Sequence, residues 1–99
     1  MTTKEYNGWT NYETWLVKLW MDNEEGTHRM FQDMADEYLK TDGEDSPLGL
    51  ADAIKEAHQE SLPELTGFAG DLMNAALSEV NWFEIAESLF EEAKERVAA

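Results

Sequence analysis

The sequence contains no cysteine, which excludes disulfide bonds and thiol chemistry. No apolar run approaches the roughly 20 residues of a membrane-spanning helix. The first seven residues hold one lysine and no apolar stretch, so we expect no signal peptide and a cytoplasmic protein. Basic residues are scarce, since seven Lys and Arg stand against 22 Asp and Glu for a formal net charge of −15. Such a polyanion repels nucleic acid and membranes, so neither is expected as a direct partner.

Aliphatic residues and phenylalanine are few as well. Leu, Ile, Val and Phe total 19 of 99 residues, which at this net charge is a warning of disorder. Four Trp, three Tyr and five Met nevertheless recur in register with the aliphatics, whereas disordered acidic chains are poor in aromatic residues. We therefore predict one acidic helical domain over residues 1–99, of the all-α class, as a compact bundle of about five short helices.

The spacing of apolar residues predicts the first two helices. The first runs from about Tyr12 to Asn23 and opens with a capping box of Thr10 and Glu13. Gly26 is expected to end this segment, and Thr27 to cap a second helix over about 28–40. One apolar face of the first helix is predicted to be buried, made of Tyr12, Trp15, Leu16, Leu19 and Trp20.

Three further helices follow in the second half of the chain. The third begins at Ser46-Pro47, and Pro63 stops or kinks it. The fourth covers about 65–80, where Gly67 and Gly70 weaken the first turn but permit a neighbour to pack closely. The fifth is capped by Asn81 and extends to about Val97.

No constellation of residues indicates catalysis or metal binding. The only histidines, His28 and His58, lie on different predicted helices, and the loop 42–45 lacks the EF-hand pattern. Nucleophile, phosphate-loop and dinucleotide motifs are missing, and the acids lie on polar helix faces where all are solvated alike. We therefore expect a protein that is not an enzyme, with no catalytic residue, no cofactor and no metal.

The acids themselves are the main functional signal. Glu84, Glu87, Glu91 and Glu95 recur in steps of three and four along the fifth helix, about 4.5–6 Å apart. This spacing is of the same order as that of phosphates along a DNA strand, about 3.4 Å. Asp33, Asp36 and Glu37 form a second row. We predict that both rows bind a basic, nucleic-acid-binding protein of the host or of its defence systems.

The aromatic residues support an alternative function. Trp15, Trp20 and Trp82 fall on apolar helix faces and are predicted to lie in the core, and the turn at 6–9 tucks Trp9 against it or leaves it exposed. Phe83 and Phe90 lie off the inward stripe of the fifth helix, so either two neighbours cover them or they contact another chain. The alternative is thus a helical homodimeric interaction module, with Trp9, Phe83 and Phe90 at its apolar interface and acids that serve only solubility.

Two strings carry a family resemblance. Residues 7–15, NGWTNYETW, with 19–23, LWMDN, resemble the opening of a family of small acidic proteins of bacteriophages, plasmids and bacteria, and residues 76–87, ALSEVNWFEIAE, resemble its closing motif. That family has no settled activity, so the resemblance implies a mobile-element protein acting on host machinery and no site residues. Phage antirestriction proteins that mimic DNA are similar in size, charge and helicity, although they share no motif with this chain. We therefore predict an inhibitor that mimics DNA charge, of the anti-restriction or anti-CRISPR type.

Overall fold

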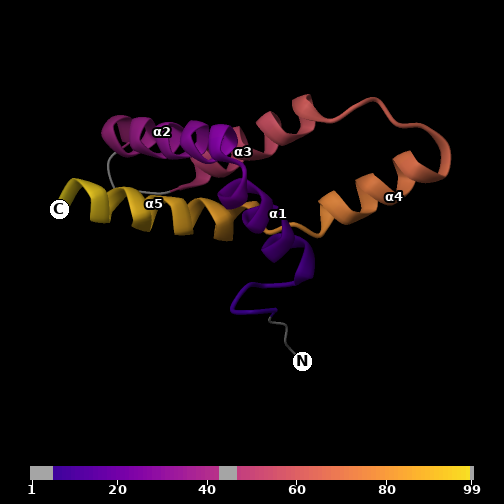
Figure 1. Cartoon of the computed structure of the whole chain (residues 1–99), viewed down its shortest axis with the longest axis horizontal. Coiled ribbons are helices and arrows are strands. Elements are labelled where there is room, and N and C mark those ends of the chain that lie inside the picture. Colours follow the sequence, from indigo (N-terminus) through magenta and orange to yellow (C-terminus); the bar gives the residue numbers. More distant parts are fainter. Residues whose placement is uncertain (1–5, 43–46, 99) are drawn as a thin grey trace.

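The computed structural model describes residues 6–42 and 47–98, and within them the chain forms five α-helices and no strand (Figure 1). The all-α class is thereby confirmed. The helices are α1 (Tyr12–Asn23), α2 (Glu25–Asp42), α3 (Leu48–Ser61), α4 (Gly67–Ser78) and α5 (Trp82–Ala98). None of the described helices is long and apolar enough to cross a membrane.

The core is built around α5. This helix packs against α2 and α3, and α1 packs against α2 and α5. Ile85, Leu89 and Ala93 recur every four residues on one face of α5 and are at most 2% exposed. They meet a layer of buried apolar side chains from the other helices, namely Met21, Phe31, Ala35, Leu50 and Ile54. Among the described residues α4 belongs to none of the packed helix pairs, and Figure 1 shows it standing apart from the others.

The N-terminal segment confirms one predicted turn. The backbones of Tyr6 and Trp9 exchange hydrogen bonds of 2.7 and 2.8 Å. Between them Asn7 and Gly8 both have positive φ, at 50° and 89°, as a type I′ turn requires. The turn directs Trp9, which is half-buried, against the core, which is the first of the two alternatives considered for this residue.

The predicted capping residues of the first two helices are wrong. The side chain of Asn11, not that of Thr10, caps α1, and its Oδ1 accepts a hydrogen bond from the Thr14 N–H at 2.9 Å. The break between α1 and α2 lies at Glu24, and α2 already includes Gly26. Thr27 therefore lies in the first turn of α2, where its hydroxyl donates to the Glu24 carboxylate.

The predicted buried face of α1 is also wrong. The buried residues of this helix are Thr14, Lys18 and Met21. Tyr12 is 47% and Trp20 58% exposed, and the rest of the predicted stripe is half-buried, namely Trp15, Leu16 and Leu19. Two residues of the observed buried face, Thr14 and Lys18, make polar contacts with Asn81 and Glu92, and the predicted apolar stripe is left half-buried or exposed.

The turn from α3 to α4 agrees with the prediction from Pro63 and the glycines. Helix α3 ends at Ser61, two residues before Pro63. Gly70 is buried, and a Cβ atom added there would lie 2.6 Å from the Leu65 carbonyl oxygen. Only a glycine permits this approach, which holds the first turn of α4 against the connecting segment. Gly67, at the first position of α4, has a φ of +63°.

Candidate protein-binding surface

The predicted acidic row of α5 is only partly free. Glu87 and Glu95 are exposed, and the structure gives neither an ion pair among the described residues. Glu91 lies 3.6 Å from the Lys94 Nζ, but its side chain is 71% exposed, so this pair contributes little. Glu84 does not belong to the free row, because it is half-buried and its Oε1 accepts a hydrogen bond from the Thr10 N–H at 2.9 Å.

The second predicted row, on α2, is weaker than the sequence suggested. Asp33 and Glu37 are exposed, but the Asp36 carboxylate lies 2.7 Å from Arg96 Nη2 and is therefore neutralised. Arg29 precedes Asp33 by four residues and Lys40 follows Glu37 by three, so both cations share the exposed face of the row. They lower the negative potential that a partner would meet on α2.

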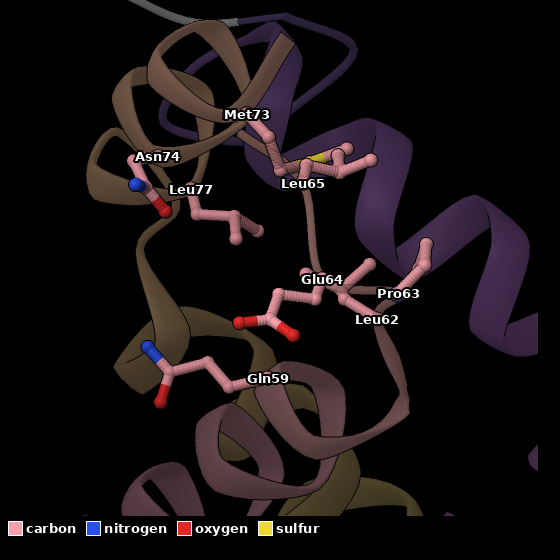
Figure 2. Close-up of a pocket in the computed structure, with 9 residues that line it drawn as sticks. Gln59, Leu62, Pro63, Glu64, Leu65, Met73, Asn74 and Leu77 are labelled. Carbon is pink, nitrogen blue, oxygen red and sulfur yellow. The ribbon is translucent and has the colours of Figure 1, made fainter. Parts of the chain in front are cut away.

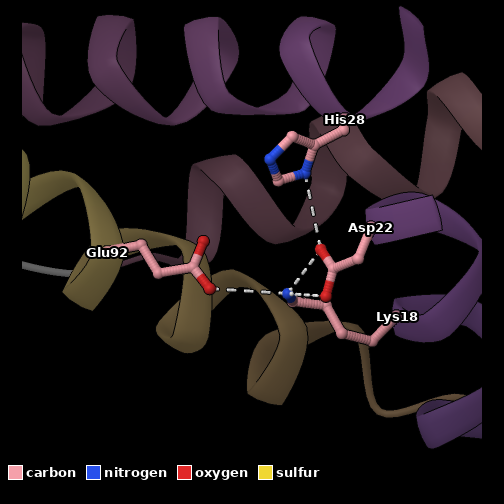
Figure 3. Close-up of polar contacts among 4 residues, drawn as sticks. All are labelled: Lys18, Asp22, His28 and Glu92. Atoms are coloured by element: carbon pink, nitrogen blue, oxygen red, sulfur yellow. Dashed lines mark hydrogen bonds and ion pairs between the residues drawn. The ribbon is translucent and has the colours of Figure 1, made fainter. Parts of the chain in front are cut away.

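One of the seven basic residues, Lys18, is buried and forms ion pairs within the fold. Its Nζ donates to both carboxylate oxygens of Asp22 at 2.9 Å and lies 3.6 Å from Glu92 (Figure 3). Figure 3 also shows His28 beside Asp22, with 3.6 Å between Nδ1 and the carboxylate. The network joins α1, α2 and α5, so its role is to hold these helices together.

The longest stretch of the sequence without Lys or Arg lies between Lys55 and Lys94, and it includes most of the α5 row. From Glu56 to Ala93, here named the cation-free segment, the chain has nine Asp and Glu and no Lys or Arg. The segment covers the end of α3, all of α4 and most of α5. Its exposed carboxylates are those of Glu56, Glu60, Glu64, Asp71, Glu79, Glu87 and Glu91.

The three residues predicted for an apolar interface, Trp9, Phe83 and Phe90, differ in how far they are buried. Phe90 is 3% exposed and belongs to the core, so it cannot contact another chain in this structure. Trp9 also packs against the core, and Phe83 is 37% exposed. Of the tryptophans predicted to be buried, Trp82 is 9% exposed as expected, whereas Trp20 lies at the surface.

A hollow of about 420 Å³ separates α4 from the end of α3. Figure 2 shows Leu77 and Glu64 pointing toward it from opposite sides, with Gln59 on the α3 side. Met73 and Asn74 of α4 therefore face this hollow, and Leu77, which also lines it, packs in part against the core. The opposite side of α4 faces solvent.

The two strings that carry the resemblance meet in space. Asn11 and Asn81 cap α1 and α5 by accepting from the N–H groups of Thr14 and Glu84. Each cap is then tied to the other helix, since the Asn81 N–H donates to the Thr14 hydroxyl at 2.8 Å and its amide donates to the Thr10 hydroxyl at 3.0 Å. The Asn11 amide also donates to the Glu79 carbonyl at 2.7 Å, so the two caps form one hydrogen-bonded network.

These hydrogen bonds give both strings a structural explanation. A family model described as a family of unknown function, DUF7249, matches residues 2–96. The chain belongs to DUF7249. No curated protein and no solved structure matches it.

Sequence reasoning found only the α5 part of the cation-free segment of this DUF7249 member, with Glu84, Glu87 and Glu91, and missed its carboxylates on α3, α4 and their connections. The rows on α2 and α5 were chosen by helical spacing, which counts carboxylates and ignores the cations beside them. The available signal was the distance along the chain between successive basic residues, which is largest between Lys55 and Lys94.

The described residues offer no evident metal site. Within 6–42 and 47–98, no group of three or more His, Asp or Glu side chains is arranged to hold a metal ion. His58 is stacked on Phe31, with ring centroids 5.1 Å apart, and its Nδ1 lies 2.9 Å from the Ile54 carbonyl oxygen. The loop 42–45, compared above with a calcium loop, lies outside the residues whose side chains the structure describes.

Proposed function

We propose that this protein binds a basic, nucleic-acid-binding protein through the cation-free segment and the adjoining carboxylates of α5, and so keeps that partner from nucleic acid. In this proposal it acts in the cytoplasm as an inhibitor carried by a phage or another mobile element. Its target is a host or defence protein, such as a restriction enzyme or a CRISPR effector, which meets it as a mimic of DNA.

The observation that supports the proposal is the excess of carboxylates in the cation-free segment. Two of them pair with cations from outside it, Glu92 with Lys18 and Glu91 weakly with Lys94. Carboxylates of the segment are exposed on α3, α4 and α5, and the sequence places no Lys or Arg among them. Surface charges of one sign attract a partner of the opposite sign and accelerate its association. Glu87, Glu91 and Glu95 rise by about 6 Å per step along α5, which suits Lys and Arg side chains that otherwise bind phosphates.

The alternative of a homodimer through Trp9, Phe83 and Phe90 is less well supported. Phe90 and Trp9 already pack in or against the core of one chain. A contact centred on α5 would also bring the carboxylates of two copies together, and like charges at an interface oppose binding.

The experiment that tests the proposal is capture of a partner from bacterial lysate on the immobilised protein, followed by elution with a DNA duplex instead of salt. The purified partner is then used to compare two double variants. Glu60→Gln with Glu87→Gln removes two exposed carboxylates of the cation-free segment, and Glu24→Gln with Glu25→Gln removes two exposed carboxylates at the α1–α2 junction.

We expect the DNA duplex to displace the partner and the first double variant to bind about tenfold more weakly. The control double variant has the same net charge and is expected to bind within about twofold of the parent. A partner that holds DNA and this protein at the same time would contradict the proposal. Equal losses in the two variants would show that net charge alone is recognised.

A further inference from the structure

The outward face of α4 is apolar and exposed. Phe68 is 83% and Leu72 58% exposed, and Ala75, which is also exposed, continues the same line at the next helical step. Residues spaced by four and three lie on one side of a helix, so these three residues form one ridge. We name this ridge the outer face of α4, and it lies opposite the side that lines the hollow.

Helix α4 makes few contacts with the other helices, and none of the contacts described for it uses its outer face. Among the described residues α4 belongs to none of the packed helix pairs. Its first turn contacts the connecting segment at Gly70 and Leu65, and Leu77 near its end packs in part against the core. Contiguous exposed apolar side chains on a small protein mark interaction sites. A helix held at its first turn and free along its outer face is suited to receive another helix.

The charges around the outer face select the kind of partner. Asp71 and Glu79 are exposed beside or beyond the ridge, and the nearest basic residues in the sequence are Lys55 and Lys94. A second copy would place carboxylates against carboxylates, and an anionic lipid surface is repelled for the same reason. A partner with Lys or Arg beside its apolar residues would pair with the carboxylates that flank the ridge.

We propose that the outer face of α4 docks an amphipathic helix whose apolar stripe is flanked by Lys or Arg. This inference rests on the proposed function, because it names the segment by which the basic partner would be held. With 12 residues, α4 is about 18 Å long, so it matches about three turns of the partner helix. Phe68 and Leu72 supply the apolar contact, and Asp71 with Glu79 selects the basic flanks.

The test uses two synthetic 18-residue helical peptides with the same leucine stripe, one flanked by Lys and the other by Glu. Binding to the full chain is measured by calorimetry in moderate salt. We expect the Lys peptide to bind and the Glu peptide to show no binding. The double variant Phe68→Ser with Leu72→Ser is expected to weaken the Lys peptide at least about tenfold, and its circular dichroism should be unchanged because both side chains are exposed.

Met30→Ser is the matched control, since Met30 is 46% exposed on α2, and it is expected to bind the Lys peptide as the parent does. Unchanged peptide affinity in the Phe68 and Leu72 double variant would overturn the inference. It would also be overturned by a dimer in analytical ultracentrifugation that this variant abolishes, since the occupant would then be a second copy. Sedimentation with phosphatidylcholine vesicles that depends on Phe68 and Leu72 would overturn it in favour of lipid.

The same variant separates this inference from the proposed function. In the DNA-competition assay described above, a partner that is weakened by Glu60→Gln with Glu87→Gln but not by Phe68→Ser with Leu72→Ser leaves the proposed function intact and refutes docking on α4. A partner that neither variant weakens refutes both. Weakening by both variants, together with binding of the Lys peptide, supports both.

Discussion

Helices α4 and α5 are neighbours in the chain, yet they have opposite relations to the core. Ile85 and Leu89 of α5 are at most 2% exposed, whereas Phe68 and Leu72 of α4 are more than half exposed. Both helices carry large apolar residues at helical spacing. The comparison teaches that an apolar stripe at helical spacing does not by itself ensure burial, and the two helices also differ in the polar contacts that tie them to the rest of the fold.

Those polar contacts are concentrated on α5. Asn81 and Glu84 tie its start to α1, the Lys18 ammonium joins Glu92 to α1, and Arg96 joins its last turns to Asp36 of α2. Within the described residues, the structure gives α4 no ion pair to another helix. Three changes would sharpen or break this contrast, and they are ordered by the size of the expected effect.

The largest difference is expected between Ile85→Ala and Leu72→Ala. Ile85 is fully buried, so its truncation leaves a cavity and should lower the free energy of unfolding by about 2–5 kcal/mol. Leu72 is 58% exposed, and its truncation should change that free energy by less than about 0.5 kcal/mol. Urea denaturation followed by circular dichroism measures both. Equal losses would mean that α4 packs as firmly as α5.

A smaller effect is expected from Lys18→Ala, which removes the buried cation between α1 and α5. The side chain is 6% exposed, and its loss leaves Asp22 and Glu92 facing each other without a cation. The side chains of Asp22 and Glu92 are 42% and 41% exposed, so water solvates both carboxylates in part. We therefore expect the free energy of unfolding, measured with heat or urea, to fall by about 1–3 kcal/mol.

Two further variants separate the possible causes of that loss. Lys18→Met retains the length of the side chain without its charge, and Arg96→Ala removes a pair whose partners are 36% and 41% exposed. The latter should cost less than about 1 kcal/mol. If Lys18→Ala costs no more than Arg96→Ala, the Lys18 network does not anchor α5.

The smallest of the three effects is expected at the helix caps. Asn81→Ala should cost about 1–2 kcal/mol, because the side chain caps α5 and also binds Thr10. Thr66→Ala, at the start of α4, should cost less than about 0.5 kcal/mol, since Thr66 makes no side-chain cap hydrogen bond. Asn11→Ala combined with Asn81→Ala should be non-additive, because the two caps share one network. Additive losses in urea denaturation would show that the caps act separately.

Much of the fold was predictable because it depends on local interactions. The bounds of α1, the stop before Pro63, the cap at Asn81 and the close approach at Gly70 each follow from a few adjacent residues. The capping of α1 was mistaken because Thr10 and Asn11 are both good caps, and contact with Asn81 decided between them. The prediction that Glu84 belongs to the free acidic row was wrong because its hydrogen-bond partner, the Thr10 N–H, lies 74 residues away in the sequence.

The acidic character of the candidate surface was predictable from the sequence, but the residues that form it were only partly so. Composition indicated a polyanion, and helical spacing found Glu87 and Glu95, which are exposed. Spacing did not show that Asp36 is paired with Arg96 or that Phe90 is buried, because each depends on a helix distant in the chain.

The sequence by itself determined the helical class, the approximate helix bounds and an excess of carboxylates that a folded surface must carry, because these depend on composition and on residues within one or two turns. The tertiary structure alone decided which face of α1 is buried, which acids are neutralised and that the outer face of α4 is uncovered. Each of these depends on contacts between distant segments, such as Lys18 with Glu92, whose energies are set by geometry that no local pattern contains.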